Sequence, residues 1–136
     1  MKKVILCAIA LIIASASMFA QEDLKAKANA DLQKMVGAWT FSLENPQGGP
    51  SIDGVATFTK DDNGVKCVIA GYGNDLKSGY FTPREDGRSL ASIPIDEYGI
   101  DIYLFVKLDA KGNIVSYMDI GGMMDASCIM YPKKTE

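Results

Sequence analysis

The chain has 136 residues, of which 48% are hydrophobic and 23% charged, which is the composition of one small globular domain. Its 14 Lys and Arg residues against 17 Asp and Glu residues give a net charge of −3, which argues against a nucleic-acid-binding surface. Histidine is absent. This excludes Ser-His and Cys-His nucleophile pairs and the commonest zinc ligand sets.

The first twenty residues have the pattern of a secretory signal peptide. Lys2 and Lys3 precede an apolar run over residues 4–13, and small residues follow as far as Ala20. We expect cleavage after Ala20, with residues 14–16 as an alternative site. Removal of the segment leaves 12 basic residues against 17 acidic ones, a net charge of −5. The apolar run is too short to span a bilayer comfortably, so we expect a periplasmic or secreted protein without stable membrane insertion.

Residues 21–136 are expected to form one β-rich domain that opens with a helix from Glu22 to about Met35. Apolar residues at helical spacing form one stripe on it, namely Leu24, Ala28, Leu32 and Met35. After Gly37 the apolar period changes from that of a helix to the two-residue alternation of strands. Eight strands are predicted: 38–43, 54–60, 65–70, 77–82, 88–95, 100–108, 114–120 and 126–131.

Short loops between these strands favour an up-and-down antiparallel meander. Closing the meander into an eight-stranded β-barrel would remove both exposed edges. The helix is then expected to pack across one end of the barrel.

The residues at the start of the first strand resemble a known motif. A short helix followed by Gly37-Ala38-Trp39 is similar to the G-x-W motif of the lipocalins in the calycin superfamily, including small lipocalin-like proteins exported by bacteria. The resemblance implies structural roles for Gly37 and Trp39, with the tryptophan under the closed end and ligand entering at the other end. Lipocalins also place an arginine after the last strand, where this chain has Lys133 and Lys134.

Successive loops of a meander alternate between its two ends, so the loops over 44–53, 71–76, 96–99 and 121–125 are expected at the end far from the helix. They are rich in Gly, Tyr and Met, which suits an apolar or amphiphilic ligand. We expect four side chains to line this open mouth: Tyr72, Tyr98, Met123 and Met124. The alternative is that these side chains anchor their loops on the rim.

Two cysteines, Cys67 and Cys128, remain after removal of the signal peptide. In an oxidising compartment they form a disulfide, worth about 4 kcal/mol in the chain-entropy model. The alternative is two buried thiols, because each lies in an apolar strand-like segment. We expect no cofactor and no metal site, since the chain has no histidine and no calcium-loop pattern.

These patterns predict an exported, non-enzymatic binding protein for a small apolar or amphiphilic molecule. The alternative is a protein-interaction module with a filled barrel, such as a secreted protease inhibitor or an envelope assembly factor. In the inhibitor, a mobile helical arm over 21–35 would enter the protease cleft. An enzyme ranks third, because the Asp, Glu, Lys, Tyr and Cys side chains show no recognisable catalytic grouping.

Overall fold

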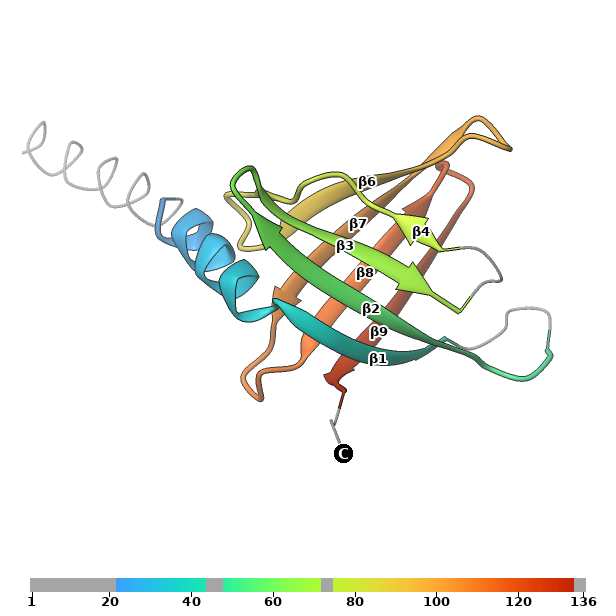
Figure 1. Cartoon of the computed structure of the whole chain (residues 1–136), viewed down its shortest axis with the longest axis horizontal. Helices are drawn as coiled ribbons and strands as arrows, with labels where there is room; N and C mark the ends of the chain where they lie inside the picture. Colours follow the sequence, from blue (N-terminus) through green and yellow to red (C-terminus); the bar gives the residue numbers. More distant parts are fainter. Residues whose placement is uncertain (1–21, 44–47, 72–74, 134–136) are drawn as a thin grey trace, which may run out of the picture.

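The computed structural model describes residues 22–43, 48–71 and 75–133. The predicted signal peptide and Tyr72 lie outside these residues. One helix over 22–34 precedes an antiparallel sheet that curls into a half-barrel (Figure 1). Its nine strands are β1 (Gly37–Leu43), β2 (Ile52–Asp61), β3 (Gly64–Ala70), β4 (Leu76–Lys77), β5 (Thr82–Pro83), β6 (Ser89–Ile95), β7 (Ile100–Leu108), β8 (Ile114–Ile120) and β9 (Met124–Pro132).

The strand order in the sheet is β4-β3-β2-β1-β9-β8-β7-β6-β5. Apart from β4 and β5, which lie at the two ends of this order, strands that are neighbours along the chain pair with each other, and β1 lies beside β9. Tight turns join paired strands that follow each other in the chain. In the β2–β3 turn the Asp61 carboxylate accepts a hydrogen bond from the Asn63 N–H, and Gly64 follows with a φ of 139°. The predicted up-and-down antiparallel order is confirmed.

The predicted strand count of eight is wrong, because residues 77–82 do not form one strand. The Ser78 N–H donates to the Cys67 carbonyl oxygen of β3 (2.9 Å), and the next N–H, that of Gly79, donates to the Ser92 carbonyl oxygen of β6 (2.9 Å). The Phe81 N–H then donates to the Val65 carbonyl oxygen of β3 (2.8 Å), so the segment bonds β3 and β6 in turn. Its two ends form the separate short strands β4, paired with β3, and β5, paired with β6.

The inside of the curl is packed with apolar side chains. The rings of Phe58 and Phe81 stack at 5.6 Å between centroids, and Phe41 and Leu104 are buried with them, as the two-residue alternation predicts. The buried cluster takes residues from the helix and from the strands: Leu32, Met35, Trp39, Phe41, Ala56, Phe58, Val65, Cys67, Ile69, Phe81, Ala91, Ile93, Ile102, Leu104, Val106, Ile114, Met118 and Met130. The end of the curl that carries the helix, and its centre, are thus filled by side chains of the protein itself.

Trp39 fixes the helix to one end of the curl. Its indole Nε1–H donates to the Met35 carbonyl oxygen at 2.7 Å, just beyond the last helical turn, and both side chains are buried. Gly37 lies between them with a φ of 133°, a conformation that glycine adopts readily. Gly37 and Trp39, for which structural roles are predicted, thus lie where the helix joins the sheet.

A buried carboxylate forms a second link between helix and sheet. Asp31 accepts a hydrogen bond from the Leu108 N–H of β7 (3.4 Å) and forms an i,i+4 ion pair with Lys27 (3.0 Å). The helix therefore packs on the sheet through its buried residues Ala28, Asp31 and Leu32. In this structure the helix is packed on the sheet, whereas the protease-inhibitor hypothesis needs it as a mobile arm.

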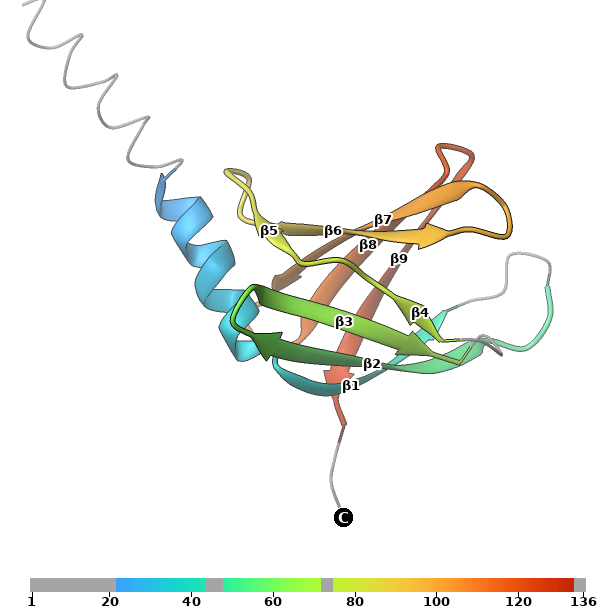
Figure 2. The same cartoon turned by 45° about the horizontal axis from the view of Figure 1, so that its top comes forward.

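Turns alternate between the two ends of the curl, as predicted. Figures 1 and 2 show the β2–β3 and β7–β8 turns at the end that carries the helix, and the β6–β7 and β8–β9 turns at the opposite end. We call this opposite end the far end.

Gly54 on β2 offers a test of how tightly the sheet is curled. A Cβ at this position would lie 2.5 Å from the Ala70 carbonyl oxygen and 2.5 Å from Phe41 Cζ, whereas a Cβ at Gly79 would have 3.8 Å to its nearest neighbour. We expect Gly54→Ala to lower the free energy of unfolding by about 1–3 kcal/mol. Gly79→Ala, the matched control, should change it by less than about 0.5 kcal/mol. Urea denaturation measures both, and equal effects would contradict the close packing at Gly54.

The segment between β4 and β5 is tied to the β2–β3 turn by a tyrosine. The Tyr80 hydroxyl donates to Asp61 Oδ2 at 2.6 Å, and this bond, more than the Asn63 N–H or the Lys66 ammonium, lowers the pKa of the Asp61 carboxyl. The folded-state pKa therefore lies below the unfolded one. The resulting stabilisation is present above the unfolded pKa and is lost as the pH falls through the folded one.

Tyr80→Phe should accordingly raise the pKa of Asp61 towards its ordinary value. An NMR titration of the carboxyl carbon measures this shift. Tyr98→Phe, which changes a tyrosine at the far end, serves as the control and should leave Asp61 unchanged. An unshifted Asp61 titration in Tyr80→Phe would show that the hydroxyl bond does not form in solution.

Candidate functional site

The pairing between the first and last strands is short. β1 pairs with β2 over all seven of its residues, but it pairs with β9 only at Trp39–Pro132 and Thr40–Tyr131. Beyond Thr40 the two strands diverge towards the far end, which Figure 2 shows as a widening angle between β1 and β9. The sheet therefore has an opening on one side, near the far end.

A cleft of about 690 Å³ occupies this opening. Its volume lies in the range of small-molecule sites. We call it the β1–β9 cleft and define it by its lining residues: Ser42, Leu43, Ile52, Ile120, Met124, Asp125, Ala126, Ser127, Cys128, Ile129 and Tyr131.

The width of the cleft follows from small side chains on β9. Inward-facing positions of this strand carry Ala126 and Cys128, which lie opposite Met118 and Ser116 of β8. Neither side chain is large enough to reach across to β1, so the space between the two strands stays open. Met130, the next inward-facing residue towards the closed end of the seam, is larger and fully buried.

The walls of the cleft are apolar and its rim carries one charge. Leu43, Ile52 and Ile120 contribute aliphatic surface from three different strands. Asp125 is the one charged residue among the described residues of the lining, and its carboxylate accepts a hydrogen bond from the Tyr117 hydroxyl at 3.1 Å. That bond raises the pKa of Tyr117. The cleft thus suits an apolar body with a hydrogen-bond-donating or cationic group at the rim.

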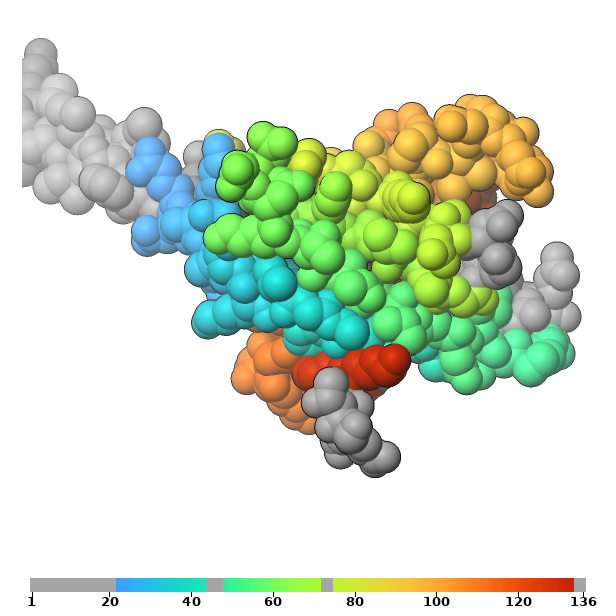
Figure 3. Space-filling model, in the orientation of Figure 1, coloured from blue at the N-terminus to red at the C-terminus, as the bar shows by residue number. Residues whose placement is uncertain are grey.

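Of the four side chains predicted to line the mouth, the structure places only Met124 in this cleft. Tyr98 is 75% exposed on the β6–β7 turn, which stands out from the body of the protein in Figure 3, and Met123 is 79% exposed on the β8–β9 turn. Tyr72 lies outside the described residues. Tyr98 and Met123 thus lie outside the lining of this cleft, and their role in ligand binding stays a prediction.

The residues that sequence reasoning missed are the aliphatic ends of strands. Ile120 continues the inward alternation of β8, and Leu43 ends β1. Both were predicted strand residues, yet their position beside an opening depends on the divergence of β1 from β9. The small inward residues Ala126 and Cys128 were the available signal for a hollow.

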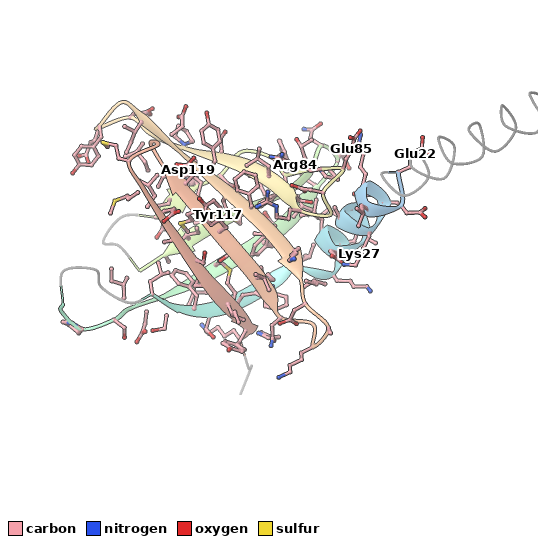
Figure 4. All side chains as sticks on the ribbon, turned by 180° about the vertical axis from the view of Figure 1, so that it is seen from behind. Glu22, Lys27, Arg84, Glu85, Tyr117 and Asp119 are labelled. Atoms are coloured by element: carbon pink, nitrogen blue, oxygen red, sulfur yellow. The ribbon has the colours of Figure 1, made fainter. Side chains whose placement is uncertain are left out.

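A second cluster lies on the outer face of the sheet around Phe105. The guanidinium carbons of Arg88 and Arg84 stand 4.3 and 5.1 Å from the centre of its ring, and the ring of Tyr117 is 5.9 Å away. Both arginines also form ion pairs with Asp86. Figure 4 shows Tyr117 and Arg84 on this face. Because these charges pair within the chain, the cluster is a weaker candidate than the cleft.

Cys67 and Cys128 are free thiols in the structure, Cys67 buried and Cys128 half-buried. Cys67 lies in the core, where burial raises the pKa of its thiol to about 11. Cys128 is half-buried at the cleft, with its Sγ 3.1 Å from the Ser116 hydroxyl, and burial also raises its pKa. The two thiols differ most in access to solvent.

This difference predicts ordered labelling of the exported chain by a thiol reagent such as 5,5′-dithiobis(2-nitrobenzoic acid). One thiol, Cys128, should react in the native state and Cys67 only after unfolding, since the thiolate must be formed and reached. Cys128→Ser should abolish native labelling, and Cys67→Ser should leave it intact. A two-dalton mass deficit in the unreduced, denatured protein would instead establish the disulfide.

In the described part of the chain, no three side chains of the types His, Cys, Asp and Glu come together as a metal site. The helix over 22–34 is too short to cross a membrane, and the described residues contain no longer apolar helix. Comparisons with known protein families, with curated proteins and with solved structures found no match. The function is therefore argued from the cleft itself.

Proposed function

We propose that this protein is an exported, non-enzymatic, lipocalin-like binding protein that takes a small apolar or amphiphilic molecule in the β1–β9 cleft. The observation that carries the proposal is the apolar lining of the cleft, which remains open although the rest of the curl is filled. Burying about 100 Å² of apolar ligand surface in such a site is worth about 2.5 kcal/mol.

The proposed fold is a closed barrel in which residues 76–83 act together as one strand between β3 and β6. Two hydrogen bonds support it, from the Ser78 N–H to Cys67 on one side and from the Gly79 N–H to Ser92 on the other. In a barrel closed by residues 76–83, the opening lies at the seam between β1 and β9. The proposed protein therefore has one binding site, in that seam.

The proposed binding mode follows the two kinds of surface in the cleft. The apolar part of the ligand lies against Leu43, Ile52 and Ile120, and its polar head lies at the rim beside Asp125. A neutral donor or a cation fits this rim better than a carboxylate, because like charges repel at short range.

Export is the part of the proposal that depends on sequence alone. The positively charged start, the apolar run over 4–13 and the small residues before Gln21 support a cleaved signal peptide. The proposed location is the periplasm or the medium, where a carrier would meet apolar molecules released from membranes or taken up from outside.

A second candidate function is a protein-interaction module. The filled interior favours it, because the barrel then serves as a scaffold and no ligand enters its centre. In this alternative the same seam, or the loops at the far end, would contact a protein.

The neutral, apolar fluorophore N-phenyl-1-naphthylamine tests the carrier proposal. Its fluorescence should rise on binding the wild-type chain. Ala126→Phe, which fills the cleft from β9, should weaken binding by about tenfold or more, a loss of about 1.4 kcal/mol. Ala110→Phe in the exposed β7–β8 turn is the matched control and should bind like the wild type.

Absence of dye binding to the wild type, or equal binding by Ala126→Phe and Ala110→Phe, would overturn the proposed site. Thermal unfolding of both variants shows whether each one is folded. A folded wild type that binds no dye would favour the protein-interaction module.

A further inference from the structure

The lining of the β1–β9 cleft contains an unbroken run of main chain. All six residues over 124–129 contact it. Alternate residues of a strand point to opposite faces of the sheet, so a pocket on one face touches every second residue. A pocket that touches six in a row runs along the edge of the strand. The cleft therefore exposes the backbone of β9 as well as its side chains.

The backbone groups of β9 alternate between its two neighbouring strands. The Lys133 N–H donates to the Ala38 carbonyl oxygen (3.0 Å), and the Thr40 hydroxyl donates to the Tyr131 carbonyl oxygen (3.4 Å), so residues 131 and 133 turn their peptide groups towards β1. By the same alternation, every odd-numbered residue of this strand faces the β1 side.

The even-numbered residues face the other way. The Cys128 carbonyl oxygen accepts a hydrogen bond from the Ser116 hydroxyl of β8 (3.0 Å), which places residue 128 in the β8 ladder. It follows that Asp125, Ser127 and Ile129 turn their N–H and C=O groups into the cleft. Among the described residues, pairing between β1 and β9 stops at Thr40–Tyr131, so no described strand pairs with Asp125, Ser127 or Ile129 on this side.

From this edge we infer that the ligand of the cleft is an extended peptide that adds as a strand to β9. The inference rests on the proposed function, because it names the ligand class of the same site. An unpaired strand edge offers a row of donors and acceptors that an extended peptide satisfies and a plain hydrocarbon does not. The length of edge over 124–130 accommodates a peptide of about seven residues, at ~3.3 Å per residue.

The residues around the cleft also indicate which side chains such a peptide carries. Residues on its inner face meet Leu43, Ile120 and Met124, which favour aliphatic side chains. On the outer face, Asp119 and Asp125 lie directly opposite each other across β8 and β9. Like charges in this position destabilise a sheet, and a cation between them relieves the repulsion. The peptide is thus apolar on one face and basic on the other.

A terminally blocked seven-residue peptide of alternating Lys and Val is the probe for this inference. Isothermal titration calorimetry measures its dissociation constant for the exported chain and for two variants at one position. Ser127→Pro removes an N–H that faces the cleft and leaves the ladder with β8 intact, because proline is accepted where the N–H side of a strand is free. We expect it to weaken binding by about tenfold, close to the value of one lost hydrogen bond.

Ser127→Ala is the matched control. It removes the same hydroxyl but keeps the N–H, so it should bind the peptide about tenfold more tightly than Ser127→Pro does. Two further probes need no change in the protein. The first is the same peptide with Glu in place of Lys. The second is a pair of peptides N-methylated at every second residue, one at the odd positions and one at the even positions. The Glu peptide, and the N-methylated peptide in the register that faces β9, should each bind at least about tenfold more weakly.

The outcomes separate this inference from the proposed function. Binding of N-phenyl-1-naphthylamine should be the same in Ser127→Pro and Ser127→Ala, which shows that the cleft is folded, because the dye uses no backbone donor. Dye binding without peptide binding, or equal peptide affinity for the two variants, overturns the strand-addition inference and leaves the carrier proposal standing. If Ser127→Pro does not fold, equal binding of the plain and the N-methylated peptides by the wild type overturns the strand-addition inference. Failure of both dye and peptide overturns both proposals.

Discussion

The short pairing between β1 and β9 is the constraint on which the rest of this structure depends. Two residue pairs, Trp39–Pro132 and Thr40–Tyr131, join the first strand to the last and make the meander curl. Because the pairing stops there, the two strands diverge and leave the β1–β9 cleft between them. A longer ladder would close this seam, and a weaker one would leave β1 to β4 and β5 to β9 as two separate sheets with exposed edges.

Packing at the helix end compensates for the open seam. The Trp39 indole bonds the Met35 carbonyl oxygen, Asp31 bonds the backbone of β7, and the core cluster fills the space between them. Filled cores are rigid, and a rigid scaffold keeps a cleft at its other end in a fixed shape. The division agrees with the proposed function: apolar burial on the helix side stabilises the fold, and the small side chains of β9 leave room for a ligand.

Sequence patterns predicted most strands, because one face of each strand is buried and its two-residue alternation of apolar residues is therefore strong. The bounds of β8, over 114–120, were predicted as observed. The segment predicted as one strand over 77–82 is regular only at its two ends, in β4 and β5. Between them Ser78 and Phe81 both donate to β3 and Gly79 donates to β6, which breaks the alternation of a regular strand, and no local pattern records such a break. The proposed cleft lies near the far end, where the sequence places the ligand mouth, but Tyr98 and Met123, which were chosen by residue type in turns, lie outside its lining. Ile120 and Leu43 mattered more, since strand ends and not turn tips face the opening.

The sequence by itself determined the class of fold: a helix with one apolar stripe, then antiparallel strands joined by tight turns whose ends alternate along the chain. These properties depend on residues close together in the chain, through side-chain periodicity and turn geometry. Only the tertiary structure decided where the curl opens. That opening depends on how far β1 and β9 pair, and these strands are the first and last in the chain. Their separation is set by the packing of the whole core between them, which no segment of the sequence contains.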